Sequence, residues 1–181
     1  MTTNEAPFRS ASSELVTNRQ TTLTLQPITA AEAPLLAWRI AAIDPWLTLG
    51  ISAERLTRAL LDPDLHICMR ALRCEDVGLT GVVGVRHPWL YGPYLSMLAI
   101  FPEHHGHGHG AAVLDWLARE AEGVSRNVWV CASTINQPAI GFYRRHGFEP
   151  VGEIPELVAD GFSELLMRKR LSRPGAQASE L

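Results

Sequence analysis

The sequence has little cysteine, and its few thiols follow no ligand pattern. Cys68, Cys74 and Cys131 are an odd number of cysteines, spread through apolar segments without Cys-x-x-Cys spacing. Such thiols are typical of a reduced cytosolic protein, because disulfide frameworks and zinc sites need paired or closely spaced cysteines. The cysteines therefore predict neither a disulfide-stabilised fold nor a structural zinc site.

Long hydrophobic runs are also missing. The first twenty residues lack the apolar stretch of about 7 to 15 residues that a signal peptide requires. A run of about 18 apolar residues, the minimum for a transmembrane helix, occurs nowhere in the chain. We therefore expect a cytoplasmic protein that neither enters nor binds a membrane.

An excess of basic charge is absent as well. The 16 Lys and Arg residues are outnumbered by 19 Asp and Glu residues, which gives a formal net charge of −3, and the longest basic run is Arg168-Lys169-Arg170. A basic face that binds nucleic acid is therefore not expected. With 181 residues, of which 46% are hydrophobic, the chain is long enough for one domain with its own core.

Polar ends flank the part of the chain that carries periodic hydrophobic patterns. Residues 1–21 and 173–181 are rich in small polar residues, and we expect flexible tails there. Residues 22–172 are predicted to form a single domain. Helices are expected at residues 29–43, 52–61, 111–122 and 136–146, and strands at residues 65–72, 78–86, 94–101, 127–132, 148–153 and 162–171, after a short alternating run around Leu23 and Leu25.

The order of these elements predicts the type of sheet. Short turns separate the three strands between residues 65 and 101, which is typical of an antiparallel meander. The helix at 111–122 then connects the strands at 94–101 and 127–132, and such a crossover makes its flanking strands parallel neighbours. Thr29 and Glu32 have the capping-box spacing that begins a helix. The chain is therefore predicted to be an α/β or α+β protein with a mixed sheet.

A glycine-rich loop connects a predicted strand to a predicted helix. It reads His104-His105-Gly106-His107-Gly108-His109-Gly110. Glycines at every second position let backbone N–H groups converge on one point, and a helix N-terminus adds partial positive charge. The loop therefore suits a phosphate or pyrophosphate.

Two nucleotide-binding motifs fit this loop poorly. Gly106-x-Gly108-x-x-Ala111 nominally matches the dinucleotide-binding fingerprint, but the next strand ends without the acidic residue that this motif places about 20 residues on. The Gly-Lys-Ser/Thr of a Walker loop is absent. A different phosphate-bearing ligand is therefore expected.

Two blocks of residues resemble the GCN5-related N-acetyltransferase (GNAT) family. The first is His105-x-x-Gly108-x-Gly110 after Ile100-Phe101-Pro102, with His105 where the family usually has Gln or Arg; the second is Asn136, Ala139-Ile140, Phe142-Tyr143 and Gly147-Phe148. The resemblance implies a mixed, mostly antiparallel central sheet of about six to seven strands. It also implies helices on both faces of that sheet, and a splayed parallel strand pair that binds acetyl-CoA.

The resemblance further implies roles for individual residues. Backbone groups of Leu98, Ala99 and Ile100 would bind the pantetheine arm of acetyl-CoA. The pyrophosphate would lie on the loop formed by His105, Gly106, His107, Gly108, His109 and Gly110, and Asn136 and Tyr143 would complete the cofactor site. The expected reaction is direct attack of a primary amine on the thioester in a ternary complex, with Tyr143 as the acid that protonates the departing thiolate.

The general base and the amine acceptor are less well defined. Some family members, which resemble ribosomal-protein N-terminal acetyltransferases, carry a glutamate where this chain has Cys131, and a thiol on an apolar strand is a poor base. Asp44, Glu103, Glu156 or a water chain are the alternatives. Asp44, Trp46 and Tyr94 are candidates for binding the acceptor, a small-molecule amine or a peptide or protein amine, although Trp46 is equally suited to the core.

Four histidines in the loop invite a different interpretation. His104, His105, His107 and His109 alternate with glycines that give a flexible frame, and no Cys or Asp lies beside them to complete a metal site. We expect no metal, and predict that these histidines replace the Arg and Lys that often line the CoA phosphates.

Two other functions stay open at this stage. One is a non-catalytic acyl-CoA-binding or sensor domain, because the residues at 105 and 131 depart from the family pattern. The other is a metal-binding protein that uses the histidine tract. The resemblance also allows a homodimer, because many relatives pair, but no residue pattern decides the oligomeric state.

Overall fold

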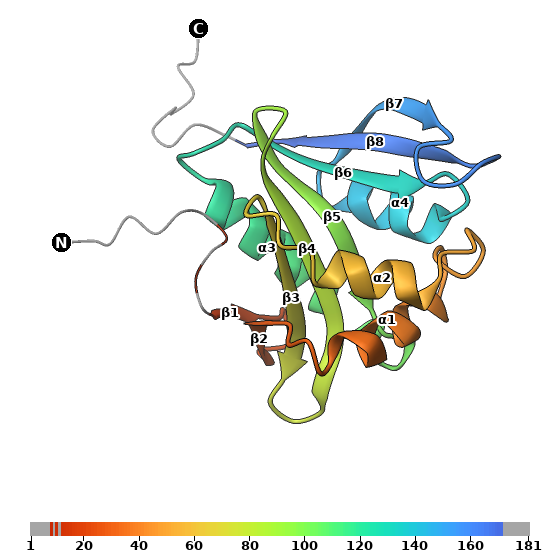
Figure 1. Cartoon of the computed structure of the whole chain (residues 1–181). Coiled ribbons are helices and arrows are strands. Elements are labelled where there is room, and N and C mark those ends of the chain that lie inside the picture. The colour runs from red at the N-terminus through yellow and green to blue at the C-terminus, as the bar shows by residue number, and fades with distance from the viewer. Residues whose placement is uncertain (1–7, 9, 11, 172–181) are drawn as a thin grey trace, which may run out of the picture.

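The computed structural model describes residues 8, 10 and 12–171, and contains one sheet with helices on both faces (Figure 1). The strands are β1 (Ser13–Val16), β2 (Thr22–Pro27), β3 (Ile67–Cys74), β4 (Gly78–Trp89), β5 (Gly92–Ile100), β6 (Asn127–Ser133), β7 (Glu149–Pro155) and β8 (Ser163–Arg170). The helices are α1 (Ala33–Ala41), α2 (Ala53–Leu60), α3 (His109–Ala121) and α4 (Gln137–Arg145), with a short 3-10 helix, η1 (Pro102–His104), before α3.

The sheet has eight strands in the order β1-β2-β3-β4-β5-β6-β8-β7. Strands β3, β4 and β5 form the predicted antiparallel meander, and β5 and β6 form the predicted parallel pair, which α3 connects. All other neighbours are antiparallel. The predicted mixed, mostly antiparallel sheet is therefore confirmed.

The sheet begins earlier in the chain than the predicted domain boundary at residue 22. Ser13–Val16 pairs with β2, and the Leu15 side chain is 1% exposed in the core. A strand of four residues is too short to show a clear alternation, which explains why the sequence predicts a tail over residues 1–21. Residues 1–7, 9 and 11, and the predicted tail at 173–181, lie outside the described residues.

Helices cover both faces of the sheet and divide the core into two layers. Helices α1 and α2 lie on one face, and α3 and α4 lie on the other (Figure 1). The first layer includes Leu36, Ile40, Leu56, Leu60, Val82, Met97, Ala99 and Phe101, and the second includes Leu15, Val83, Leu95, Val113, Leu117, Val130, Tyr143 and Met167. Because side chains alternate along a strand, neighbouring residues such as Val82 and Val83 contribute to opposite layers.

Two helix starts follow local sequence signals to different extents. The Ser52 hydroxyl accepts a hydrogen bond from the Arg55 N–H at 3.2 Å and so caps α2. Thr29 accepts a hydrogen bond from the Glu32 N–H at 3.3 Å, but the Glu32 carboxylate pairs with Arg73 at 2.9 Å instead of returning to Thr29. The predicted capping box is therefore half formed, and α1 begins at Ala33.

A bulge in β5 separates the two parallel strands. The pairing between β4 and β5 shifts between Gly84 and Val85, which leaves Ser96 as the extra residue on β5. Bulges bend the strand that carries them. Parallel pairing with β6 is limited to Tyr94 with Trp129 and Leu95 with Val130, and so ends just before the bulge. We call residues 96–100 of β5 and 131–133 of β6, where the strands have separated, the strand fork.

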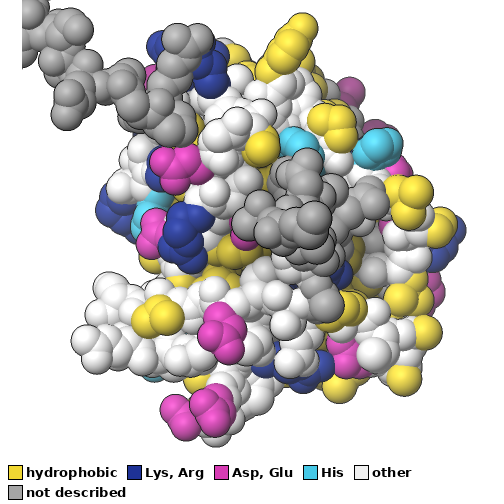
Figure 2. Space-filling model, turned by 90° about the vertical axis from the view of Figure 1, so that its left-hand side faces the viewer, with side chains coloured by type: hydrophobic (Ala, Val, Ile, Leu, Met, Phe, Trp, Pro, Cys, Tyr) yellow, Lys and Arg dark blue, Asp and Glu magenta, His cyan; other side chains and the backbone are white. Residues whose placement is uncertain are grey.

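The surface of the molecule carries mixed charge. On the face drawn in Figure 2, Lys and Arg side chains are interspersed with Asp and Glu side chains and with single hydrophobic side chains, and the coloured residues of this face form no continuous basic area. Among the described residues, no helix combines the length and apolar composition needed to cross a membrane.

Candidate active site

The glycine loop leads from β5 through η1 to the first turn of α3. Gly106 and Gly108 have φ angles of +76° and +83°, a left-handed conformation that favours glycine. The backbone N–H groups from Gly106 to Ala111 donate no hydrogen bond to any described residue. Unpaired N–H groups at a helix N-terminus favour a bound anion. The loop geometry therefore supports the predicted phosphate site.

The loop is held between α4 and the turn that joins β1 to β2. A Cβ atom added to Gly110 would lie 3.1 Å from Cζ of Phe142 on α4, and one added to Gly108 would lie 2.6 Å from Oδ1 of Asn18 in the turn. Gly106 faces open space. Asn18 belongs to the segment that the sequence predicts to be a tail, so sequence reasoning missed its proximity to the loop.

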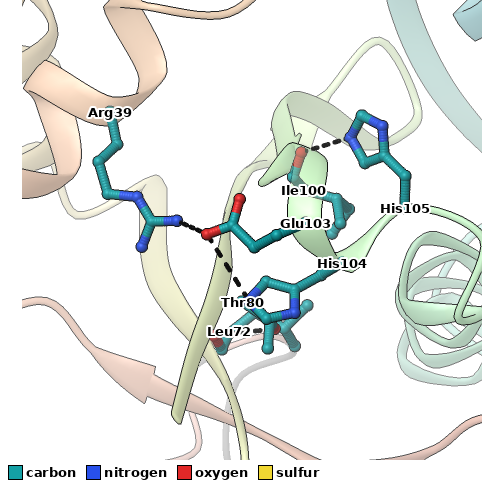
Figure 3. Close-up of polar contacts among 7 residues, drawn as sticks. All are labelled: Arg39, Leu72, Thr80, Ile100, Glu103, His104 and His105. Atoms are coloured by element: carbon teal, nitrogen blue, oxygen red, sulfur yellow. Dashed lines mark hydrogen bonds and ion pairs between the residues drawn. The ribbon is translucent and has the colours of Figure 1, made fainter. Parts of the chain in front are cut away.

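His105 connects the loop to the end of β5. Its Nε2 donates a hydrogen bond of 2.7 Å to the backbone carbonyl of Ile100 (Figure 3). Ile100 is one of the three β5 residues predicted to contact the pantetheine arm, and its carbonyl oxygen is therefore engaged by the loop. His105 thus ties the start of the glycine loop to the end of β5.

Removal of this hydrogen bond is expected to weaken acetyl-CoA binding. A single hydrogen bond is worth about 1 kcal/mol, so the variant His105→Ala should raise the Kd of acetyl-CoA by about fivefold. His105→Gln restores a side-chain donor and should bind nearly as tightly as the wild type. Calorimetric titration of both variants checks this, and equal affinity of His105→Ala and the wild type would contradict it.

Glu103, one of the candidate bases, is held by a neighbouring helix. Its carboxylate forms an ion pair with Arg39 of α1 and lies 3.9 Å from Nε2 of His104 (Figure 3). Backbone hydrogen bonding lowers the pKa of Glu103, and Arg39 and His104 lower it further. A carboxylate with a lowered pKa is a weak base, so the structure favours an anchoring role for Glu103.

The histidines of the loop form a cluster at the start of α3. The His109 ring is 5% exposed, stacks 5.9 Å from the His104 ring and lies 6.0 Å from the His107 ring, and its Nδ1 has no hydrogen-bond partner among the described residues. Burial lowers the pKa of His109, and its two histidine neighbours add to this effect. Within residues 12–171, no group of three or more His, Cys, Asp or Glu side chains is arranged to hold a metal ion.

We expect this cluster to make the affinity for acetyl-CoA depend on pH. Protonated imidazoles attract phosphates, so we expect a lower Kd at about pH 6 than at about pH 8, beyond what titration of the ligand explains. Burial lowers the pKa of His109, so its ring takes up a proton at a lower pH than an ordinary histidine does. Titration of wild type and a His107→Asn variant at both pH values measures the effect, and a flat profile for the wild type would remove it.

Tyr143 lies on α4, and Asn136 directly precedes this helix, which packs on the same face of the sheet as α3. The Asn136 Oδ1 accepts a hydrogen bond from the Ala139 N–H at 3.1 Å, so this residue caps α4. Tyr143 is 6% exposed and its ring packs between Phe142 and Phe148. Burial alone raises the pKa of Tyr143, which keeps the hydroxyl protonated at neutral pH.

Tyr94, Cys131, Ser133 and Glu164 lie together beside the strand fork, and we call them the fork cluster. Tyr94 and Cys131 lie within hydrogen-bonding range, and both interact with Glu164. Burial is the largest cause that raises the pKa of Tyr94 and of Cys131. The cluster therefore holds neutral groups at neutral pH around one buried carboxyl group. Sequence reasoning named Tyr94 and Cys131 but missed Glu164.

The other residues predicted to bind the acceptor or to act as the general base form hydrogen bonds or packing contacts with other parts of the fold. Asp44 Oδ1 accepts hydrogen bonds from the Thr48 hydroxyl at 2.7 Å and the Thr48 N–H at 3.2 Å. Glu156 Oε1 accepts one from the Gly161 N–H at 3.1 Å. Trp46 is half-buried against the α1–α2 layer, which matches its alternative interpretation as core. The hydrogen bonds of Asp44 and the packing of Trp46 thus involve residues outside the fork cluster.

The structure is thus an α/β protein in which a separated parallel strand pair lies next to a glycine loop with unpaired backbone N–H groups. The model of the Acetyltransferase (GNAT) family matches residues 32–148, and the chain belongs to this family, whose members use acetyl-CoA as co-substrate. A search of curated proteins gives no match.

Solved structures of acetyltransferases have the same fold. An acetyltransferase from Thermus thermophilus is 21% identical, with 88% of this chain and all of that chain covered and a TM-score of 0.65. Nourseothricin acetyltransferase is 28% identical over 59% of this chain and 66% of that chain, with a TM-score of 0.53. Arabidopsis thaliana NAA60, in complex with a bisubstrate analogue, is 18% identical over 82% and 97%, with a TM-score of 0.62.

Proposed function

We propose that this protein transfers an acetyl group from acetyl-CoA to a primary amine by direct attack in a ternary complex. The observation that carries the proposal is the strand fork, flanked by the unpaired N–H groups of the glycine loop and by the buried Tyr143. Acetyl-CoA supplies the activated acyl group as a thioester. The chain supplies binding, orientation and proton transfer.

The glycine loop and β5 together suit the shape of the co-substrate. The N–H groups from Gly106 to Ala111 would bind the pyrophosphate. Residues Leu98–Ile100 pair with β4 on one edge, while their other edge faces the fork, so an amide-bearing chain could add there as an extra strand. This arrangement would place the thioester at the fork, between Tyr143 and the fork cluster.

Tyr143 is suited to stabilise the departing sulfur by donating a hydrogen bond. A phenol has an ordinary pKa near 10 and a thiol one near 8.5, so full proton transfer from tyrosine to a thiolate is uphill. Burial raises the pKa of Tyr143 and increases this difference. The Tyr143 hydroxyl would therefore act mainly by holding its proton against the developing negative charge.

The acceptor is proposed to be a small-molecule amine or a peptide amine. The structural neighbours include a nourseothricin acetyltransferase and NAA60 bound to a bisubstrate analogue. The second of these supports direct transfer, because a bisubstrate analogue mimics two substrates held together. The fork cluster offers this chain a polar surface on which an amine could bind.

Calorimetric titration of acetyl-CoA into chelator-treated protein, followed by a screen of amines read by thiol release, tests the proposal. Saturable 1:1 binding and turnover of at least one amine would support it. Binding without turnover across amines and peptides would instead identify an acyl-CoA-binding or sensor domain. An absence of binding would contradict the proposal and favour the metal interpretation of the histidine tract.

A further inference from the structure

We propose that Glu164 binds the ammonium group of the acceptor at the strand fork and takes its proton. This inference rests on the proposed function, because it assigns the general base that the reaction needs and that the sequence left open. It is carried by the position of Glu164 in the sheet, by its unpaired oxygen, and by the absence of a basic partner among the described residues.

The position of Glu164 follows from strand register. It lies on β8, opposite Ser133 of β6 and Ile154 of β7. Leu165 and Met167 pack into the α3–α4 layer, so Glu164 points to the other face of the sheet. On β6, Val130 and Ala132 belong to that same layer, and Cys131 and Ser133 therefore share the face of Glu164.

Glu164 thus brings a carboxyl group next to Cys131. Cys131 pairs with Leu166 and Ser133 with Glu164, so Glu164 lies diagonally across the ladder from the cysteine. In this chain the neighbouring strand supplies a carboxyl group to the same region.

The surroundings leave Glu164 without a partner of opposite charge. The side chain is 5% exposed, and its Oε1 atom and the Oγ atom of Ser133 have no hydrogen-bond partner among the described residues. The groups that interact with Glu164 are Tyr94, Cys131 and Ser133. No Lys, Arg or His among residues 12–171 contributes to the shift of the Glu164 pKa. A buried carboxylate without a cation is costly, and an ammonium ion would remove this cost.

The chemistry of the carboxyl group suits proton transfer. Burial raises the pKa of Glu164, and the nearby Ser133 hydroxyl offsets only part of this effect. A raised pKa makes the carboxylate a stronger base than an exposed one. Tyr94 and Cys131, the neighbours of Glu164 in the fork cluster, are partly exposed. The other candidate bases, Asp44, Glu103 and Glu156, have partners of their own.

The proposed step balances in protons and electrons. The acceptor enters as an ammonium ion, and the Glu164 carboxylate takes one of its protons. The nitrogen lone pair then forms the N–C bond while the C–S bond breaks, and the bonding electrons leave on sulfur. The nitrogen then releases its second proton to solvent, and the CoA thiolate, which Tyr143 stabilises by a hydrogen bond, takes one proton from solvent. Glu164 returns its own proton to solvent after the product leaves.

The test compares Glu164→Gln with Glu153→Gln, a matched change at an exposed residue of β7. Acetyl-CoA affinity is measured by calorimetry, and acetylation of spermidine, benzylamine and a tetrapeptide with a free N-terminus is followed by thiol release between about pH 6 and about pH 9. We expect Glu164→Gln to keep the wild-type Kd of acetyl-CoA but to lower kcat/KM by about 10²-fold, and to lose the rise in rate that follows titration of the carboxyl group. Glu153→Gln should behave as the wild type. A wild-type rate and pH profile in Glu164→Gln would overturn the inference.

A stability measurement separates this inference from the proposed function. A carboxyl group whose folded pKa is raised favours the folded state at low pH, and this contribution is lost as the pH rises through the raised pKa. The stability of the wild type relative to Glu164→Gln should therefore fall with rising pH. If no amine is acetylated but this difference is seen, the proposed function fails while the unpaired acid is established. If the difference is absent, Glu164 is not an unpaired buried acid and the inference fails, whatever the activity.

Discussion

Replacement of Tyr143 by Phe is expected to lower the kcat of acetyl transfer by about 10²- to 10³-fold while leaving the Kd of acetyl-CoA unchanged. The hydroxyl would stabilise negative charge only as the C–S bond breaks, so its loss affects the transition state and not the bound ground state. Steady-state rates from thiol release, together with calorimetric titration of acetyl-CoA, measure the two quantities separately.

The fold should tolerate this change. Phe retains the ring contacts with Phe142 and Phe148. The lost hydroxyl is buried, and burial is the only cause that raises its pKa. The thermal midpoint of Tyr143→Phe should therefore equal or exceed that of the wild type. Tyr91→Phe, at a side chain that is 90% exposed, is the matched control and should leave both rate and affinity unchanged. If Tyr143→Phe had the wild-type kcat, the role of Tyr143 would be packing alone.

The parts of the site that sequence predicts are those encoded by local pattern. The glycine spacing at 106, 108 and 110 predicts a loop whose backbone N–H groups are free to converge on a ligand, and the structure has these groups unpaired among the residues it describes. The crossover helix predicts the parallel strand pair, because a short connection cannot join parallel neighbours. The ends of α2 and α4 follow from Ser52, Asn136 and Gly147 for similarly local reasons.

The parts that sequence does not predict depend on which strands become neighbours. Glu164 follows strand β7 in the chain, yet its strand pairs with β6 as well, and this order β6-β8-β7 is decided by packing in the whole sheet. A signal was nevertheless present, since Glu164 is a lone acid at the start of the apolar run Leu165-Leu166-Met167. Asn18 gave no signal, because β1 is too short to show periodicity.

The close packing of neighbouring strands also explains why a glycine occurs inside β4. Gly81 lies opposite Ile100, and a Cβ atom placed on it would lie 2.3 Å from the Ala99 carbonyl oxygen and 3.2 Å from the Ile100 Cα. Both are backbone atoms, so a side chain can be accommodated only if β5 moves. Ala99 and Ile100 are also proposed to bind the pantetheine arm. A glycine at position 81 is therefore needed both for the packing of β4 against β5 and for the binding of acetyl-CoA.

Replacement of Gly81 by Ala is therefore expected to lower the free energy of unfolding by about 1 to 3 kcal/mol, the usual range for an overpacked core. Acetyl-CoA affinity should fall as well, because a shift of residues 98–100 changes the edge that faces the fork. Denaturant unfolding and calorimetric titration measure the two effects. Gly84→Ala is the control on the same strand: its added Cβ meets the side-chain atoms of Met69 and Ser96, which can rotate away, so its effects should be smaller. Equal losses in the two variants would show that the approach of the β5 backbone to Gly81 does not decide the stability of this site.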